Sequence, residues 1–175
     1  GGLNFFIFNK KENVKIKKIN LNKNLFKILN KSMYTFFLNK KRDASYILES
    51  QKRLKKENIL MLRKIKNIAI ESYRKISSIK QNFFLNYFGE QLNRSWILKK
   101  NNNKKVSFEL ANKIFSFAIK NGVYGGKLLG AGGGGYFFFL AKKIHLKKIK
   151  SNFRYTTVLN LKISTEGSKF LYLSK

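Results

Sequence analysis

The chain has 175 residues, of which 43% are hydrophobic, so one domain with a buried core is expected. It contains no cysteine, which excludes disulfides and thiolate chemistry. No apolar run approaches the roughly 20 residues needed to span a bilayer. The first residues do not resemble a secretion signal, and we expect a cytoplasmic protein without a membrane partner.

The formal net charge is +30, from 38 Lys and Arg against 8 Asp and Glu. Such a charge raises nucleic acid or an anionic membrane as a partner. However, 32 of the basic residues are Lys and only six are Arg, and they are spread along the whole chain. Lys, Asn, Ile and Phe are all abundant, as expected from an AT-rich genome. We therefore favour mutational bias over a nucleic-acid surface, with a basic RNA- or membrane-binding module as the alternative.

The first forty residues predict a hairpin, a short helix and a strand. Residues 3–8 and 14–19 have the composition of two strands joined by a polar tip. Asn22 is a suitable N-cap for a helix over residues 23–30. Residues 33–38 then form a short apolar run, which predicts a buried strand.

A helical period follows from Asp43 to Lys120. Asp43 is a candidate N-cap, and apolar residues from Ile59 to Tyr73 recur at steps of three and four, which indicates an amphipathic helix. A further helix over residues 81–99 carries aromatic side chains that we interpret as core.

A solvated loop is expected over residues 101–105, before a fourth helix. Ser107 is its candidate cap, and Asn121 with Gly122 is its predicted stop after Lys120.

The remaining chain returns to strands, predicted over residues 127–129, 136–140, 153–159 and 169–173, with a short helix over 144–150. Strands at both ends of a helical centre define an α+β fold class. His145, alone in the Lys-rich helix, is interpreted as a surface residue and not as a metal ligand.

Five glycines lie between two apolar runs: Gly130, Gly132, Gly133, Gly134 and Gly135. So many adjacent glycines predict backbone conformations or close approaches that a Cβ would forbid, as in loops that hold an anion with N–H groups. A strand follows the loop, which excludes the dinucleotide-binding fingerprint, and no Gly-Lys-Ser or Gly-Lys-Thr closes it, which excludes a Walker A loop. A tight hairpin would need only two glycines.

The segment GGKLLGAGGGGYFFFL resembles the third conserved motif of the GHMP kinases, ATP-dependent kinases of small molecules, with the closest likeness to the heptose 7-phosphate kinase branch. Further matches follow in order along the chain: GGLNFFIFNK, KRDASYILESQ, FGEQLNRSWILKK and EGSKFLYLSK. The resemblance implies a ferredoxin-like C-terminal domain with extra helices over residues 21–175. Residues 1–20 would be remnant strands of the N-terminal kinase domain.

The resemblance also implies roles for individual residues. The five glycines would approach phosphate as an active-site loop. Arg42 and Ser45 match a polar pair associated with sugar-phosphate binding, and Lys99 and Lys100 match a basic pair after the Trp. Lys127 matches the Lys of the glycine motif, where a ligand contact and a structural role at the strand edge both remain open.

The family's phosphate loop and catalytic Asp do not occur in these 175 residues, and the single Asp, Asp43, has the wrong context for a general base. We therefore expect the C-terminal part of a sugar-phosphate kinase that is inactive alone, and a decayed remnant stays open. No catalytic or metal-binding residue is predicted. ATP and Mg²⁺ would serve the complete enzyme, whose N-terminal half could be a separate chain.

Overall fold

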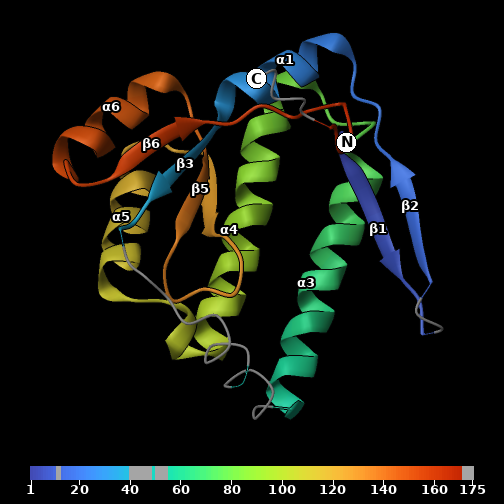
Figure 1. Cartoon of the computed structure of the whole chain (residues 1–175), viewed down its shortest axis with the longest axis horizontal. Helices are drawn as coiled ribbons and strands as arrows, with labels where there is room; N and C mark the ends of the chain where they lie inside the picture. The colour runs from blue at the N-terminus through green and yellow to red at the C-terminus, as the bar shows by residue number, and fades with distance from the viewer. Residues whose placement is uncertain (11–12, 40–48, 50–54, 171–175) are drawn as a thin grey trace.

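The structure is a computed structural model that describes residues 1–10, 13–39, 49 and 55–170. Within this part of the chain, the elements shown in Figure 1 are β1 (Asn4–Phe8), β2 (Val14–Lys18), α1 (Lys23–Ser32), β3 (Met33–Phe37), α3 (Lys55–Lys75), η1 (Gln81–Phe83), α4 (Phe84–Asn102), η2 (Lys104–Val106), α5 (Glu109–Lys120), β4 (Gly125–Leu128), β5 (Tyr136–Leu140), α6 (Lys143–Asn152) and β6 (Thr157–Asn160). The predicted α+β class is confirmed.

Four of the strands form one antiparallel sheet in the order β4-β5-β3-β6. Along the chain, α3, α4 and α5 connect β3 to β4, and α6 connects β5 to β6. This β-α-β-β-α-β order is the ferredoxin-like arrangement, with extra helices in its first connection. The ferredoxin-like fold expected from the sequence is therefore confirmed.

The predicted hairpin is also present, as a separate two-stranded sheet of β1 and β2. Phe5 stacks on the ring of Tyr73 in α3, with 4.3 Å between ring centroids, and this contact joins the hairpin to the helix. Figure 1 shows the hairpin beside α3, on the side away from α4. The other hairpin face leaves Phe6, Phe8, Val14 and Ile16 exposed. A domain boundary at residue 20 remains a prediction.

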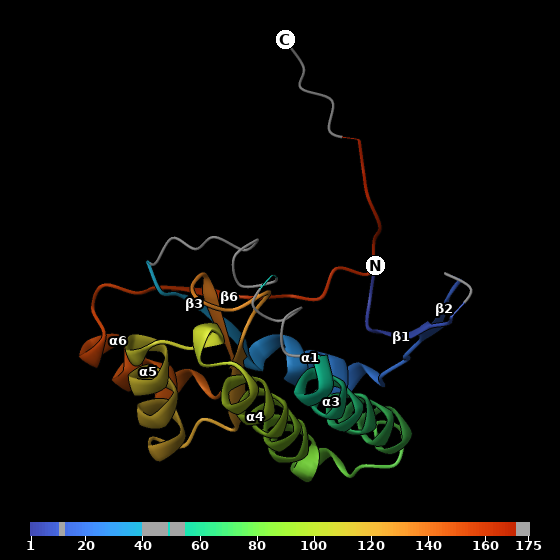
Figure 2. The ribbon, with the colours of Figure 1, turned by 90° about the horizontal axis from the view of Figure 1, so that it is seen from below.

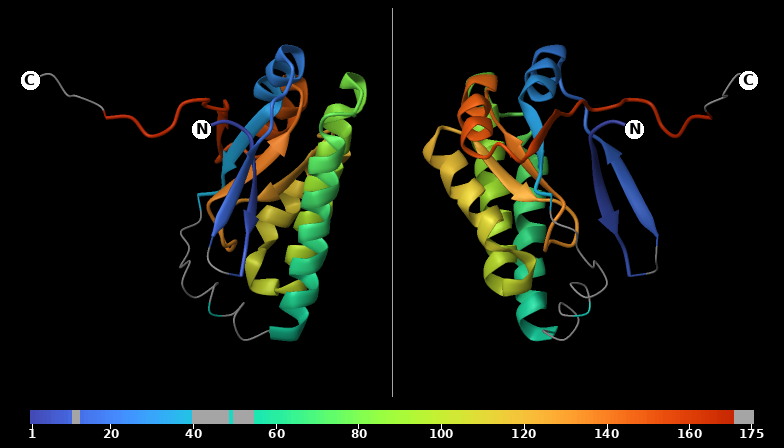
Figure 3. Two further views of the ribbon diagram at one scale, coloured as in Figure 1. Left: turned by 90° about the vertical axis from the view of Figure 1, so that its right-hand side faces the viewer. Right: turned by 60° about the vertical axis from the view of Figure 1, so that its left-hand side comes forward.

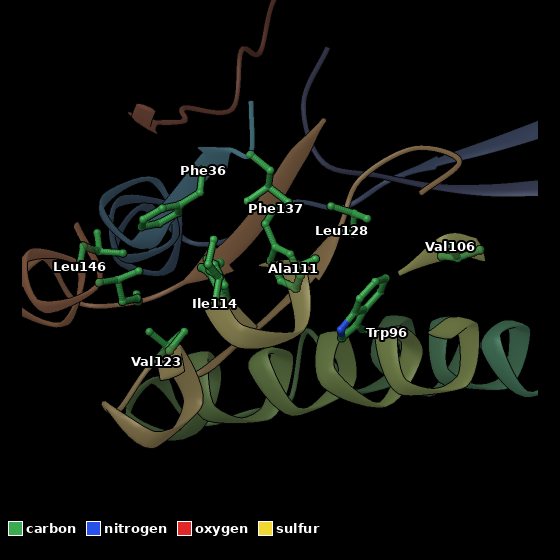
Figure 4. Packing of buried hydrophobic residues seen from close by; sticks show 14 residues of the cluster. Phe36, Trp96, Val106, Ala111, Ile114, Val123, Leu128, Phe137 and Leu146 are labelled. Atoms are coloured by element: carbon green, nitrogen blue, oxygen red, sulfur yellow. The ribbon is translucent and has the colours of Figure 1, made fainter. Parts of the chain in front are cut away.

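One face of the four-stranded sheet is closed by helices (Figure 4). Phe137 and Leu128 on the sheet are fully buried against Trp96 of α4 and Ile114 of α5. The Trp96 and Phe137 rings meet edge to face at 5.4 Å, which suits their quadrupoles. This closed face holds the main core of the domain.

Helix α4 covers the open edge of β4, where unpaired backbone groups would otherwise invite another strand. The Gly126 N–H donates to Asn93 Oδ1 at 2.9 Å, so a helix side chain replaces the missing strand partner. A Cβ on Gly125 would collide with the Gly89 backbone, so the helix and strand touch at two glycines. Figure 2 shows α3 and α4 running side by side.

Two of the helix ends named from the sequence are observed, at Asn22 and at Gly122. Asn22 accepts a hydrogen bond from the Leu25 N–H at 2.8 Å and starts α1, which ends two residues later than predicted. Gly122 follows α5 at φ +84°, and the Val123 N–H donates to Ala118 O at 3.1 Å. This six-to-one bond is the Schellman ending that glycine favours.

Other expectations were wrong in detail. Residues 101–105 are not a loop, because α4 continues to Asn102 and η2 follows at once. Ser107 does not cap α5: its hydroxyl donates to Asn112 Oδ1, and Phe108 occupies the N-cap position without a side-chain bond.

The C-terminal segment also differs from the prediction. The strand expected from residue 153 begins at Thr157. Within the described residues, 169 and 170 are not strand, and 171–173 lie outside the described part. Figure 3 shows the segment after β6 leading away from the sheet, with the amino terminus near its start. There, the Gly2 N–H donates to Ser164 O at 2.6 Å.

Candidate functional site

The glycine loop joins β4 to β5, so the strand-loop-strand setting inferred from the sequence is observed. Four of the five glycines have positive φ: Gly130 at +67°, Gly132 at +103°, Gly133 at +73° and Gly135 at +85°. L side chains rarely adopt these angles, which explains why the loop is built of glycine. The predicted conformational need is confirmed for these four, and contact with phosphate remains a prediction.

The η2 turn supports the loop from behind. The Gly133 N–H donates to Val106 O at 2.8 Å, so this amide is used inside the fold and is not available to an anion. A Cβ on Gly132 would lie 2.6 Å from Val106 Cγ1. Val106 is itself fully buried. The loop and the turn are therefore packed together, although the sequence had indicated only solvated polar residues just before Val106.

Lys99 reaches the loop from the last turns of α4. Its Nζ donates to Gly130 O at 2.6 Å, which brings a positive charge to the start of the glycine run. The contact joins residues 31 positions apart, and the sequence indicated it only through the resemblance. Lys99 is thus the predicted substrate-binding residue that the structure brings to the loop.

Electrostatics give this lysine a second role. Helix α4 ends at Asn102, so the negative end of its dipole lies near the loop and disfavours an anion there. Lys99 and Lys100 occupy the last turn of the helix and oppose that partial charge. Consecutive helical residues differ by about 100° around the axis, so Lys100 points in another direction from Lys99. Lys100 is half-buried.

Lys127 does not join the loop. It pairs with Phe138 across β4 and β5, and both line a mostly apolar cavity on the sheet face opposite Phe137. Burial there lowers the pKa of its amine below the ordinary 10.5. Its predicted part in sugar-phosphate binding is therefore not supported by its position.

The other predicted residues, Arg42 and Ser45, lie outside the described residues, as does Asp43. Among the residues that are described, no group of three or more His, Cys, Asp or Glu could hold a metal ion. Mg²⁺ prefers carboxylate and phosphate oxygens, and the glycines and lysines of the loop supply neither. Backbone amides and a lysine do fit a phosphate.

His145 was interpreted as a surface residue, and its side chain is half-buried. Its ring lies against Gly122 at the end of α5, where a Cβ would come within 3.1 Å of the imidazole. Its Nδ1 is buried, and the described residues offer it no hydrogen-bond partner.

No helix in the described part has the length and apolar character needed to cross a membrane.

Comparison with known families agrees with this geometry. Residues 79–157, which run from before α4 to the start of β6, match the family described as "GHMP kinases C terminal". The matched segment contains Lys99, Val106 and the whole glycine loop. Within this segment the chain is thus similar to the C-terminal domain of the GHMP kinases, and the ferredoxin-like topology agrees with the match.

Solved structures share the fold. A mevalonate kinase from Methanococcus jannaschii is 20% identical with a TM-score of 0.65, over 83% of this chain and 43% of its own. A putative sugar kinase from Campylobacter jejuni is 22% identical with a TM-score of 0.65, over 95% of this chain and 47% of its own. A D-glycero-D-manno-heptose 1-phosphate kinase from Bacteroides thetaiotaomicron is 18% identical with a TM-score of 0.55, over 91% and 42%.

The chain thus spans less than half the length of each of these three kinases. At identities of 22% or less, the likeness shows the fold and not the substrate. No curated protein sequence matches the chain significantly.

Proposed function

We propose that this chain is the C-terminal part of an ATP-dependent sugar-phosphate kinase acting on a heptose 7-phosphate in the cytoplasm. The observation that carries the proposal is the glycine loop, with four glycines at positive φ and the Lys99 ammonium on Gly130 O. Backbone donors and one cation suit an oxygen-rich anion such as a phosphate. Gly130, Gly132, Gly134, Gly135, Lys99 and Lys100 are the proposed site residues, with Arg42 and Ser45 as further contacts.

Phosphoryl transfer needs more than this glycine loop and its lysines. It relies on positioned phosphates, Mg²⁺ and an acid that orients the acceptor. The described residues hold no acidic cluster for the metal. We propose that an N-terminal kinase half, on the same chain or on another, supplies ATP, Mg²⁺ and the catalytic acid, and that these 175 residues alone are inactive.

The hairpin offers an apolar surface that the proposed N-terminal half could cover. Phe6 lies opposite Ile16 and Phe8 opposite Val14, so four exposed apolar side chains form one continuous face. Exposed ribbons with unpaired edges readily add strands. We propose that the N-terminal half extends this two-stranded sheet and covers its apolar face.

The binding proposal is tested by titrating the purified chain with heptose 7-phosphate and following binding by calorimetry. Saturable binding is expected, with Lys99→Met weakening it at least about tenfold through loss of a charged hydrogen bond. Lys143→Met, an exposed lysine on α6, is the matched control and should leave binding unchanged. Absence of binding, or equal loss in both variants, would overturn the assignment.

The activity proposal needs a second assay. The chain alone should release no ADP from ATP, Mg²⁺ and heptose 7-phosphate, and sugar-dependent release would contradict the inactive-alone part. A chimera that joins the N-terminal half of the Bacteroides kinase to this chain should release ADP when heptose 7-phosphate is present. A folded chimera that binds ATP but ignores this sugar would remove the substrate assignment.

A second function, binding of single-stranded RNA, is favoured by one surface. Helix α6 and the turn after it carry five exposed basic residues, and Tyr155 beside them is 94% exposed. A basic groove with an exposed aromatic ring is the usual platform for stacked bases. Tyr155→Ala should then weaken binding of an oligouridine, with a steep dependence on salt. RNA binding that ignores Tyr155 would leave only diffuse charge attraction.

A further inference from the structure

The cavity lined by Lys127 and Phe138 lies apart from the glycine loop. It has a volume of about 430 Å³ and lies between the hairpin, α1, α3, α4 and the sheet face that carries Phe138. Small-molecule sites measure roughly 300 to 1,000 Å³, so this space is large enough for a ligand. Its lining is mostly apolar, and among the described residues the only charged side chain in it is Lys127.

Lys127 can be placed along α4 from two hydrogen bonds on either side of it. Asn93 of α4 is hydrogen-bonded to Gly126, and Lys99 of α4 is hydrogen-bonded to Gly130. Residue numbers along the helix and along the strand therefore increase in the same direction. Lys127 therefore lies opposite the turn of α4 that carries Ser95, and both line the cavity. In the described part of the chain, no carboxylate lines this space. An ammonium without a counter-ion in apolar surroundings is unfavourable and calls for an anion.

Two neutral polar groups accompany the amine. Gln91 and Ser95 are one helical turn apart on α4, and both line the cavity. Gln91 is only 6% exposed, and its Oε1 accepts a hydrogen bond from Arg94 at 2.9 Å. This bond orients the amide so that its nitrogen is the remaining donor, and the described residues offer that nitrogen no acceptor. That nitrogen can donate to a ligand in the cavity.

We propose that this cavity binds a medium-chain fatty carboxylate, whose hydrocarbon chain lies among the apolar side chains and whose carboxylate meets Lys127 and Gln91. A single ammonium matches a single negative charge, whereas a phosphate would leave further charge in apolar surroundings. An uncharged hydrocarbon would leave the amine without a counter-ion. Ser95 contributes little, because its hydroxyl already donates to Leu92 O at 2.9 Å.

The site is independent of the proposed kinase function. The carboxylate of the fatty acid would lie beside Lys127 on β4, before the glycine loop. The sugar phosphate would lie at the loop itself, from Gly130 onward. A saturating fatty carboxylate should therefore leave the affinity for heptose 7-phosphate unchanged. Failure of one proposal is thus distinguishable from failure of the other.

The test is calorimetric titration of the 175-residue chain with decanoate and, separately, with decanol. The wild-type chain should bind decanoate with one site, and Lys127→Met should weaken it at least about tenfold, the value of one lost charged hydrogen bond. Binding of decanol should change little, because the variant keeps the apolar wall. Lys143→Met on exposed α6 is the matched control and should bind decanoate like the wild type.

A second variant protects the test against loss of the fold. Phe138→Trp enlarges a cavity-lining side chain and should reduce binding of both ligands, with the helical circular dichroism unchanged. Absence of saturable decanoate binding to the wild type would overturn the proposal. Undiminished decanoate binding by a folded Lys127→Met variant would overturn it too. The same holds if this variant loses decanol binding as much as decanoate binding.

Discussion

Phe137 and Phe138 are neighbours on β5, yet they meet different surroundings. Phe137 points to the closed face, where it is fully buried against Trp96 and stacks on Phe139 at 4.6 Å. Phe138 points to the other face and lines the open cavity with Lys127. The chain thus completes one side of its sheet with its own helices and leaves the other side partly unfilled. The packed face of Phe137 stabilises the domain, and the open face of Phe138 leaves space for binding.

The largest expected effect tests this contrast directly. Phe137→Ala should lower the free energy of unfolding by about 3 to 5 kcal/mol, because it opens a cavity in a packed core. Phe138→Ala should lower it by only about 1 to 2 kcal/mol, because its side chain already borders open space. Urea denaturation followed by circular dichroism measures both. Equal losses would show that the two faces are equally packed.

The contact between α4 and β4 gives the next effect. Gly125→Ala should cost about 3 kcal/mol or more, because the new methyl group meets the Gly89 backbone, which cannot move aside alone. Gly167→Ala is the matched control, because a Cβ there meets nothing within 4 Å. Thermal unfolding should separate the two variants clearly. A stable Gly125→Ala protein would mean that the helix does not hold the sheet edge this closely.

The glycine loop should be less sensitive. Gly132→Ala places a side chain at φ +103° and against Val106, which should cost about 2 kcal/mol. Gly134, whose φ is not positive, is the position for comparison and should lose less when changed to Ala. The free energies of unfolding from urea titration give the difference. A larger loss at Gly134 would contradict the role assigned to backbone conformation.

The smallest effect concerns the open face and has the opposite sign. Because burial lowers the pKa of Lys127 in the folded chain, the unfolded chain binds more protons between that pKa and 10.5. The desolvation penalty is therefore complete at neutral pH and disappears as the pH rises through this interval. Lys127→Met should stabilise the chain at pH 7 and lose that advantage near pH 10.5, as measured by urea midpoints. Lys143→Met should show no such dependence, and a destabilising Lys127→Met would contradict the penalty.

Several features could be predicted from the sequence because they depend on neighbours along the chain. The Asn22 cap, the Gly122 ending and the glycine loop between two strands follow from residues within about six positions of each other. The resemblance added the ferredoxin-like topology and directed attention to Lys99. The half-burial of His145 was not predicted, since it depends on α5 packing against α6, which composition does not report.

Sequence alone determined the α+β class, the helices of the centre and the position of the glycine loop, because residue periodicity and glycine conformation are local properties. The tertiary structure decided which groups meet. The Val106 turn behind the loop, Lys99 on Gly130 and Asn93 on the edge of β4 join residues roughly 25 to 35 positions apart. The face to which Lys127 points was equally undetermined, because it depends on the pairing of β4 with β5 and on the placement of α4. Such contacts arise when separate elements pack together, and no short stretch of sequence contains that information.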